Sequence, residues 1–278
     1  MIEDITLDHV ALGTEHQRDA WPRYRGDLAG IWLGDGGDLK GFLSSQARYA
    51  NGMKVEFLEP YRVEDNDFLR RFLDRNGPGP HHLTYKVKNI VAALAETEAA
   101  GYRPVGVSLE NDDWKEAFLH PKDAPGIVVQ LAQAAHTGRD VAEPAADDTP
   151  PRVPEPATLV RVVHAVASMH DGLRLFAGLL GGEETGRGED EAATWVDLAW
   201  PGPGRIRVLA PRDEHSPVAT WLDGRAGRLH HLAFTVDRPA EVPDAVALAD
   251  GSWEVPPERN LGVRLILSPD ERGELVPS

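Results

Sequence analysis

The sequence feature that most constrains the fold is an internal repeat, in which three segments recur in the same order about 150 residues further along the chain. The pairs, at separations of 155, 151 and 149 residues, are LDHVALG (7–13) with VVHAVAS (162–168), MKVEFLEP (53–60) with RIRVLAP (205–211), and GPHHLTYKV (79–87) with GRLHHLAFTV (227–236). Chance readily explains one such pair, but three pairs in register indicate a tandem duplication. We therefore expect two copies of one domain type.

A proline-rich stretch separates the two copies. Residues 136–157 contain five prolines and almost no large apolar side chain, so they cannot bury enough surface to offset the entropy lost on ordering. The length of 278 residues also suits two domains. We predict a first domain over 1–135, a linker over 136–157 and a second domain over 158–278.

The pattern of apolar residues predicts an α+β fold. Alternation of the kind seen at Val55 and Phe57 marks strands near 5–12, 30–33, 42–49, 53–59, 81–88, 102–109, 114–119 and 126–132. Helical spacing marks 17–28, 66–75 and 89–100, the last bounded by Asn89 as N-cap and by Gly101. The expected order is strand–helix–strand–strand–strand, used twice in each domain.

Composition excludes several classes of site and partner. The absence of cysteine rules out disulfides, thiolate nucleophiles and metal–thiolate sites, so any metal would need nitrogen and oxygen ligands. A net charge of −16 argues against nucleic acid, and no apolar run is long enough to predict a membrane span. The acidic start is not typical of a signal peptide. We expect a cytoplasmic protein, monomeric or homodimeric, that acts on a small-molecule substrate.

Four segments in the first half resemble a known superfamily: LDHVALG, MKVEFLEP, GPGPHHLTYKVKNIVAALAETEAAGYRPV and EAFLHPKDAPGIVVQLAQ. They are similar to the vicinal oxygen chelate superfamily, which includes glyoxalase I, methylmalonyl-CoA epimerase, extradiol dioxygenases and drug-resistance proteins. The last two segments look most like the epimerase. The resemblance covers nearly all of 5–133 and, more weakly, 159–268. It implies tandem glyoxalase-like domains, each with two βαβββ modules forming a curved mixed sheet.

The resemblance also implies a metal site in the first domain, with His9, Glu56, His82 and Gln130 as ligands. All four lie in predicted strands, whose period of two lets one inward side chain per strand converge on one ion. Such a set would suit one divalent transition metal: Zn, Ni, Co, Mn or Fe. Each residue also has a structural interpretation. Glu56 would then lie on a solvated strand face, and Gln130 would be a hydrogen-bonded core residue.

The chain departs from the family pattern at Gln130, where glyoxalase I and the epimerase have a glutamate. An amide cannot accept a proton at neutral pH, and the segment DLKGFLSSQARY (38–49) offers no second glutamate. Epimerisation by two acid/base groups is therefore poorly supported, since Glu56 is the only evident base. We predict a metal-dependent lyase or isomerase that stabilises an enolate-like intermediate by Lewis-acid action. The alternatives are a non-catalytic small-molecule binding or resistance protein and an Fe(II) dioxygenase.

The second domain is expected to lack a metal site. The positions paired with the four ligands are His164, Arg207, His231 and Ile266. A guanidinium repels a cation, and an isoleucine offers no lone pair. We expect His164 and His231 to be remnants, or part of a pocket in which Arg207 meets an anion.

Overall fold

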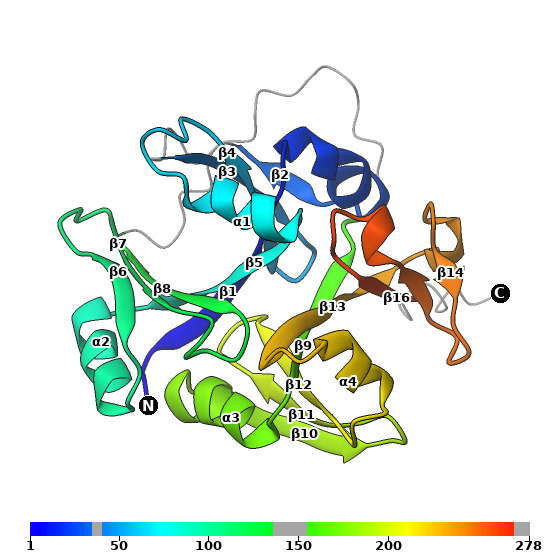
Figure 1. The fold of residues 1–278 in the computed structure, drawn as a ribbon. Helices are drawn as coiled ribbons and strands as arrows, with labels where there is room; N and C mark the ends of the chain where they lie inside the picture. The colour runs from blue at the N-terminus through cyan, green and yellow to red at the C-terminus, as the bar shows by residue number, and fades with distance from the viewer. Residues whose placement is uncertain (35–40, 136–154, 270–278) are drawn as a thin grey trace. The chain divides into compact units, whose positions relative to one another are not determined.

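Two mixed β-sheets of eight strands each make up the fold (Figure 1). The computed structural model describes residues 1–34, 41–135 and 155–269. The predicted α+β class and the recurrence of one strand order in both halves of the chain are confirmed. Most of the predicted linker lies outside the described residues, so the proposed domain boundaries remain a prediction.

The first sheet has the order β2-β3-β4-β1-β5-β8-β7-β6. Its strands are β1 (Ile5–Gly13), β2 (Ile31–Leu33), β3 (Phe42–Arg48), β4 (Lys54–Pro60), β5 (Gly79–Val87), β6 (Pro104–Ser108), β7 (Trp114–Leu119) and β8 (Val128–Ala134). Two helices accompany it, α1 (Phe68–Asn76) and α2 (Ile90–Ala99). Every strand and helix predicted in this half is present within a few residues, except that the segment 17–28 is not α-helical.

The segment 17–28, predicted as an α-helix, forms two other kinds of helical turn instead. A 3-10 turn over Gln17–Ala20 is followed by a π-helical turn over Trp21–Asp27. Pro22 has no backbone N–H to donate, and the N–H of Leu28 reaches back five residues to the carbonyl of Arg23. The N-cap predicted for α2 is confirmed, because the Asn89 side chain accepts a hydrogen bond from the backbone N–H of Ala92.

The second sheet repeats this order as β10-β11-β12-β9-β13-β16-β15-β14. Its strands are β9 (Thr158–Val166), β10 (Glu183–Glu189), β11 (Ala193–Ala199), β12 (Arg205–Pro211), β13 (Gly227–Val236), β14 (Val246–Ala247), β15 (Trp253–Val255) and β16 (Leu265–Pro269). The helices are α3 (Met169–Leu173), continued by a π-helical turn over Arg174–Leu179, and α4 (Pro217–Leu222). The counterpart of α2 is only a 3-10 turn over Pro239–Glu241, in a segment interrupted by prolines.

Each sheet carries an apolar cluster under the helix that follows its first module. In the first sheet, Ala11 of β1 and Leu58 of β4 pack with Leu69 and Leu73 of α1. In the second sheet, Val163 and Ala165 of β9 and Leu209 of β12 pack with Val218 and Leu222 of α4. These clusters show which face of each sheet its helix covers.

Backbone contacts group the chain into two compact units rather than one unit per sheet. Among the described residues, the first comprises 1–10, 81–135 and 161–230, and the second comprises 11–34, 41–80, 155–160 and 231–269. Within the described residues, no helix is both long and apolar enough to cross a membrane.

Candidate metal centre

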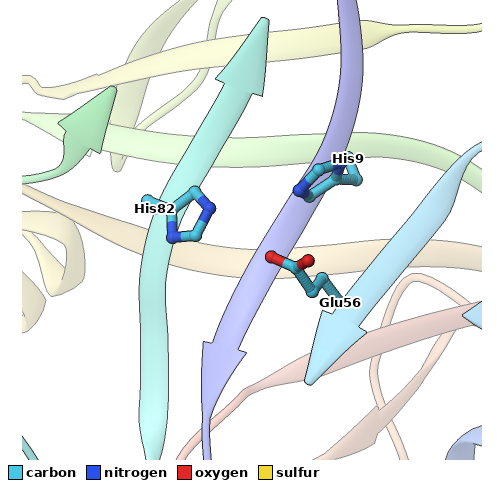
Figure 2. Close-up of side chains that lie close together, drawn as sticks. All are labelled: His9, Glu56 and His82. Atoms are coloured by element: carbon cyan, nitrogen blue, oxygen red, sulfur yellow. The ribbon is translucent and has the colours of Figure 1, made fainter. Parts of the chain in front are cut away.

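Three strands that lie next to one another bring three potential ligands together. His9 is on β1, Glu56 is on β4 and His82 is on β5, and the sheet order places these strands as β4-β1-β5. Each side chain comes from the middle of its strand, and the carboxylate of Glu56 points toward both imidazole rings (Figure 2). The predicted convergence of one side chain per strand is therefore present for three of the four candidate residues.

The spacing and burial of this cluster suit a bound cation. One ligand atom from each residue lies within 4.8 Å of the others, and the two imidazole rings are 6.0 Å apart between centroids. Two ligand atoms that each bind the same ion at about 2.1 Å are at most about 4.2 Å apart. The separations of up to 4.8 Å in this cluster are therefore only slightly larger than those around a bound ion. His9 is 2% exposed and His82 is 5% exposed. Two imidazoles and a carboxylate form a donor set for a divalent transition metal.

Each histidine has a partner that bears on its tautomer. Nδ1 of His9 lies 2.7 Å from a carboxylate oxygen of Asp8, which can only accept, so this nitrogen donates, and in the neutral ring Nε2 carries the lone pair. Nδ1 of His82 lies 2.9 Å from Nδ1 of His81. A ligand role for Nε2 of His82 requires its Nδ1 to donate to His81. The ring of His81 lies against that of His82, with 5.2 Å between their centroids.

Gln130, the fourth candidate, lies on β8, the strand next to β5, and is 7% exposed. Its amide oxygen accepts a hydrogen bond of 2.6 Å from the hydroxyl of Thr84. Its amide nitrogen donates a hydrogen bond of 2.7 Å to Glu116. The residue is thus the hydrogen-bonded core amide that the sequence allowed, and its role as a ligand remains a proposal.

Glu116 is a polar residue of this region that sequence reasoning missed. It lies on β7, two residues from Phe118, which pairs directly with Gln130 of β8. Residues two apart on a strand share a face, so Glu116 lies on the same face of the sheet as Gln130. The available signal was a carboxylate alternating with Trp114 and Phe118, which are large aromatic side chains, within WKEAFL.

In the second sheet, the predicted equivalence of His9 and His164 is wrong, because the two side chains lie on opposite faces of their sheets. His9 is two residues from Ala11 and shares its face, under α1, whereas His164 lies between Val163 and Ala165, which both pack under α4. Val163 also pairs with Arg207 across β9 and β12, and paired residues share a face of the sheet. His164 therefore points to the opposite face, where its ring lies 5.6 Å from that of Phe176.

The remaining equivalents confirm that the second sheet differs in chemistry. Thr84 pairs with Gln130 in the first sheet and Ala233 pairs with Ile266 in the second. Arg207 makes a bidentate ion pair with Asp197, with both contacts at 2.7 Å, and lies 5.1 Å from the Trp195 ring. The anion expected as a partner of Arg207 is thus the carboxylate of Asp197, a residue of the same sheet.

His164 leads to a prediction about acid stability. Burial, opposed by a hydrogen bond from Nε2 to the Pro125 carbonyl, lowers the pKa of His164 from 6.5 to about 4. Between these values the unfolded chain binds a proton that the folded chain does not, so the free energy of unfolding falls as the pH decreases. The loss attributable to this group between pH 7 and pH 4 is about 3 kcal/mol.

Urea unfolding at pH 7, 5 and 4 would measure this loss as a difference between variants. His164→Leu cannot bind the proton and is expected to lose less stability than the wild type on acidification. His215→Gln, which removes an exposed histidine, is expected to follow the wild type. Equal pH dependence in His164→Leu and wild type would refute the assignment.

The chain is similar to known proteins in sequence and in fold. A family model described as the Glyoxalase/Bleomycin resistance protein/Dioxygenase superfamily matches residues 8–118. The ethylmalonyl-CoA/methylmalonyl-CoA epimerase of Cereibacter sphaeroides is 31% identical over 137 residues, which are 46% of this chain and 96% of that protein. The crystal structure of methylmalonyl-CoA epimerase from Mycobacterium tuberculosis covers 47% of this chain and 89% of its own, at 23% identity and a TM-score of 0.42.

A second solved structure extends the similarity to the whole chain. A hypothetical protein from Staphylococcus aureus covers 96% of this chain and 100% of its own, at 11% identity and a TM-score of 0.59. At this level of identity the match concerns the fold alone. It confirms the tandem arrangement of two glyoxalase-like sheets in one chain.

Proposed function

The chain belongs to the Glyoxalase/Bleomycin resistance protein/Dioxygenase superfamily, and from this membership we propose that it is a metal-dependent isomerase or lyase acting on a small oxygenated substrate. The observation that carries the proposal is the His9–Glu56–His82 cluster on three adjacent strands. The cluster offers nitrogen and oxygen donors only, as a chain without cysteine must. We propose His9, Glu56 and His82 as ligands, with Gln130 completing the site.

A bound divalent ion would supply Lewis-acid polarisation of a substrate oxygen. The chain's own residues would do the rest. Asp8 holds His9 in the tautomer that presents Nε2, and Nδ1 of His81 would accept from Nδ1 of His82 so that Nε2 of His82 is presented as well. We assign proton abstraction to Glu56, because a carboxylate has one oxygen for an ion and another for a substrate proton. The burial of both histidines keeps water from competing with the substrate for this site.

For the substrate, we propose a compound with a C–H bond acidified by an adjacent carbonyl group. The support is the similarity to the ethylmalonyl-CoA/methylmalonyl-CoA epimerase, whose named substrates have such a bond. Inversion at this carbon needs one group to remove the proton and another to return it to the opposite face. Gln130 cannot serve as the second group. We therefore propose proton exchange without efficient inversion for a substrate of this kind.

Hydrogen exchange tests the proposal directly. The protein, loaded with Co²⁺ or Zn²⁺, would be incubated in D₂O with one stereoisomer of methylmalonyl-CoA, and loss of the α-proton would be followed by NMR. We expect metal-dependent deuterium incorporation with retention of configuration, and its suppression by a chelator. No exchange by the metal-loaded protein would contradict the proposed activity on this substrate class. Rapid racemisation would contradict the single-base mechanism.

A further inference from the structure

We infer that Glu116 is a positioning residue that decides which end of the Gln130 side chain faces β5, the strand of His82. The inference rests on the proposed function, because it concerns the fourth group of the proposed metal site. Glu116 itself lies outside the His9–Glu56–His82 cluster. It acts through Gln130, on the strand between its own strand and that of His82.

The geometry places Gln130 across three neighbouring strands. The sheet order is β5-β8-β7, and Gln130 of β8 pairs with Thr84 of β5 on one side and with Phe118 of β7 on the other. Its amide oxygen faces β5, where it meets the Thr84 hydroxyl at 2.6 Å. Its amide nitrogen faces β7, where it meets Glu116 at 2.7 Å. The two ends of the amide are thus directed to opposite sides.

The two partners of the Gln130 amide differ in whether they can distinguish its oxygen from its nitrogen. The Thr84 hydroxyl can donate or accept, so it would pair equally well with the amide oxygen or the amide nitrogen. The carboxylate of Glu116 can only accept, and it therefore requires the nitrogen. A flipped amide would place its oxygen against this carboxylate. Two acceptor oxygens would then face each other with no hydrogen between them, which is unfavourable in a buried site. Glu116 alone fixes the orientation.

Other contacts hold Glu116 in place. Nε1 of Trp114 donates a hydrogen bond of 2.8 Å to the same carboxylate oxygen that accepts from Gln130. The ammonium of Lys86 lies 3.5 Å from the centroid of the Trp114 ring, which fixes the indole on this face. The carboxylate therefore has a set position, and so does the amide that it selects.

The consequence concerns the affinity for a cation. With the nitrogen committed to Glu116, the atom of Gln130 on the His82 side is the oxygen, which can bind a divalent ion. A flipped amide would present N–H groups, which repel it. Partners of this kind typically change metal affinity by about 10–100-fold when they are removed. We expect the same range for Glu116, although it donates no ligand to the cluster.

Glu116→Gln tests the inference with little change in size, because an amide at this position can pair with either orientation of Gln130. We expect Co²⁺ to bind about 10–100-fold more weakly, with an altered visible absorption spectrum at saturation. Glu254→Gln is the matched control, since Glu254 is a half-buried carboxylate of β15 that pairs with Arg264. It is expected to bind Co²⁺ like the wild type. Thermal unfolding would show that both variants are folded.

A double variant gives the inference a signature that a general loss of structure cannot imitate. Glu116→Gln combined with Gln130→Glu reverses the hydrogen bond, so the amide introduced on β7 donates to the carboxylate introduced on β8, on the side of His82. We expect this exchange to restore Co²⁺ affinity to at least the wild-type level. Gln130→Glu alone places a second carboxylate against that of Glu116. This variant is expected to bind Co²⁺ less tightly than the double variant or to be less stable.

The outcomes separate the inference from the proposed function. Wild-type Co²⁺ affinity and spectrum in folded Glu116→Gln would overturn the positioning role while leaving the metal site intact. Failure of the double variant to regain affinity would also overturn it. If the wild-type protein binds no Co²⁺, the proposed function fails. The side-chain amide NMR signals of Gln130 would then still report whether Glu116 fixes its orientation, and unchanged signals in Glu116→Gln would refute that.

Discussion

His82→Ala is expected to remove bound divalent metal from the protein, whereas His231→Ala is expected to leave it in place. The two histidines occupy equivalent positions on β5 and β13, each as the second of two adjacent histidines. Only His82 lies with another imidazole and a carboxylate within 4.8 Å, among the residues that the structure describes. In the second sheet, Arg207 and Ile266 stand at the positions of Glu56 and Gln130, and neither offers a ligand for a cation.

The measurement is the metal content per chain after dialysis, with titration of Co²⁺ for affinity. The wild type and His231→Ala are expected to hold about one ion per chain, and His82→Ala essentially none. Loss of a ligand should exceed the about 10–100-fold cost of losing a supporting partner. Retention of metal by His82→Ala would contradict the assignment. Loss of metal from His231→Ala as well would show that the second sheet contributes to binding.

Glu56→Gln is expected to abolish most of the proton exchange even when metal is saturating. The substitution keeps the size of the side chain and an oxygen for an ion, but it removes the charge and the capacity to accept a proton. General-base catalysis contributes about 10²–10⁴-fold, so we expect a loss of exchange rate in that range. The rate should be measured at a metal concentration well above the affinity of the variant, so that weaker binding does not account for the loss.

Glu59→Gln is a suitable control on the same strand. Residues of odd and even number on β4 face opposite sides of the sheet, and Glu59 accepts a hydrogen bond of 2.8 Å from the backbone N–H of Gln17. It is expected to leave the exchange rate unchanged. Equal rates for Glu56→Gln and wild type would show that another group removes the proton, and the single-base mechanism would then be wrong.

Much of the fold follows from patterns that are local in the sequence. The alternation at Val55 and Phe57 and the cap at Asn89 depend on neighbours a few residues away, so strands and helices could be predicted within a few residues. The segment 17–28 was predicted less well, because helical spacing does not distinguish an α-helix from the 3-10 and π-helical turns found there. The in-register repeat predicted two similar sheets, because the same pattern of apolar residues in both halves produces strands that bury the same face.

Part of the candidate site could also be predicted from the sequence. His9, Glu56 and His82 each stand in a strand, and family resemblance indicated which of them would share a face. The assignment of His164 failed because a shift by an odd number of residues between repeats reverses the face of a strand, and only pairing with β12 and packing against α4 reveal the face.

The sequence by itself therefore determined the tandem architecture, the nitrogen and oxygen character of any metal site, and three residues of the candidate cluster. Only the tertiary structure decided that His164 lies on the opposite face of its sheet and which partners hold Gln130. The physical reason is that hydrogen bonds between strands join residues far apart in the chain. Glu116 is 14 residues from Gln130, and Thr84 is 46 residues from it. No local pattern specifies such pairs, whereas strand order and register do.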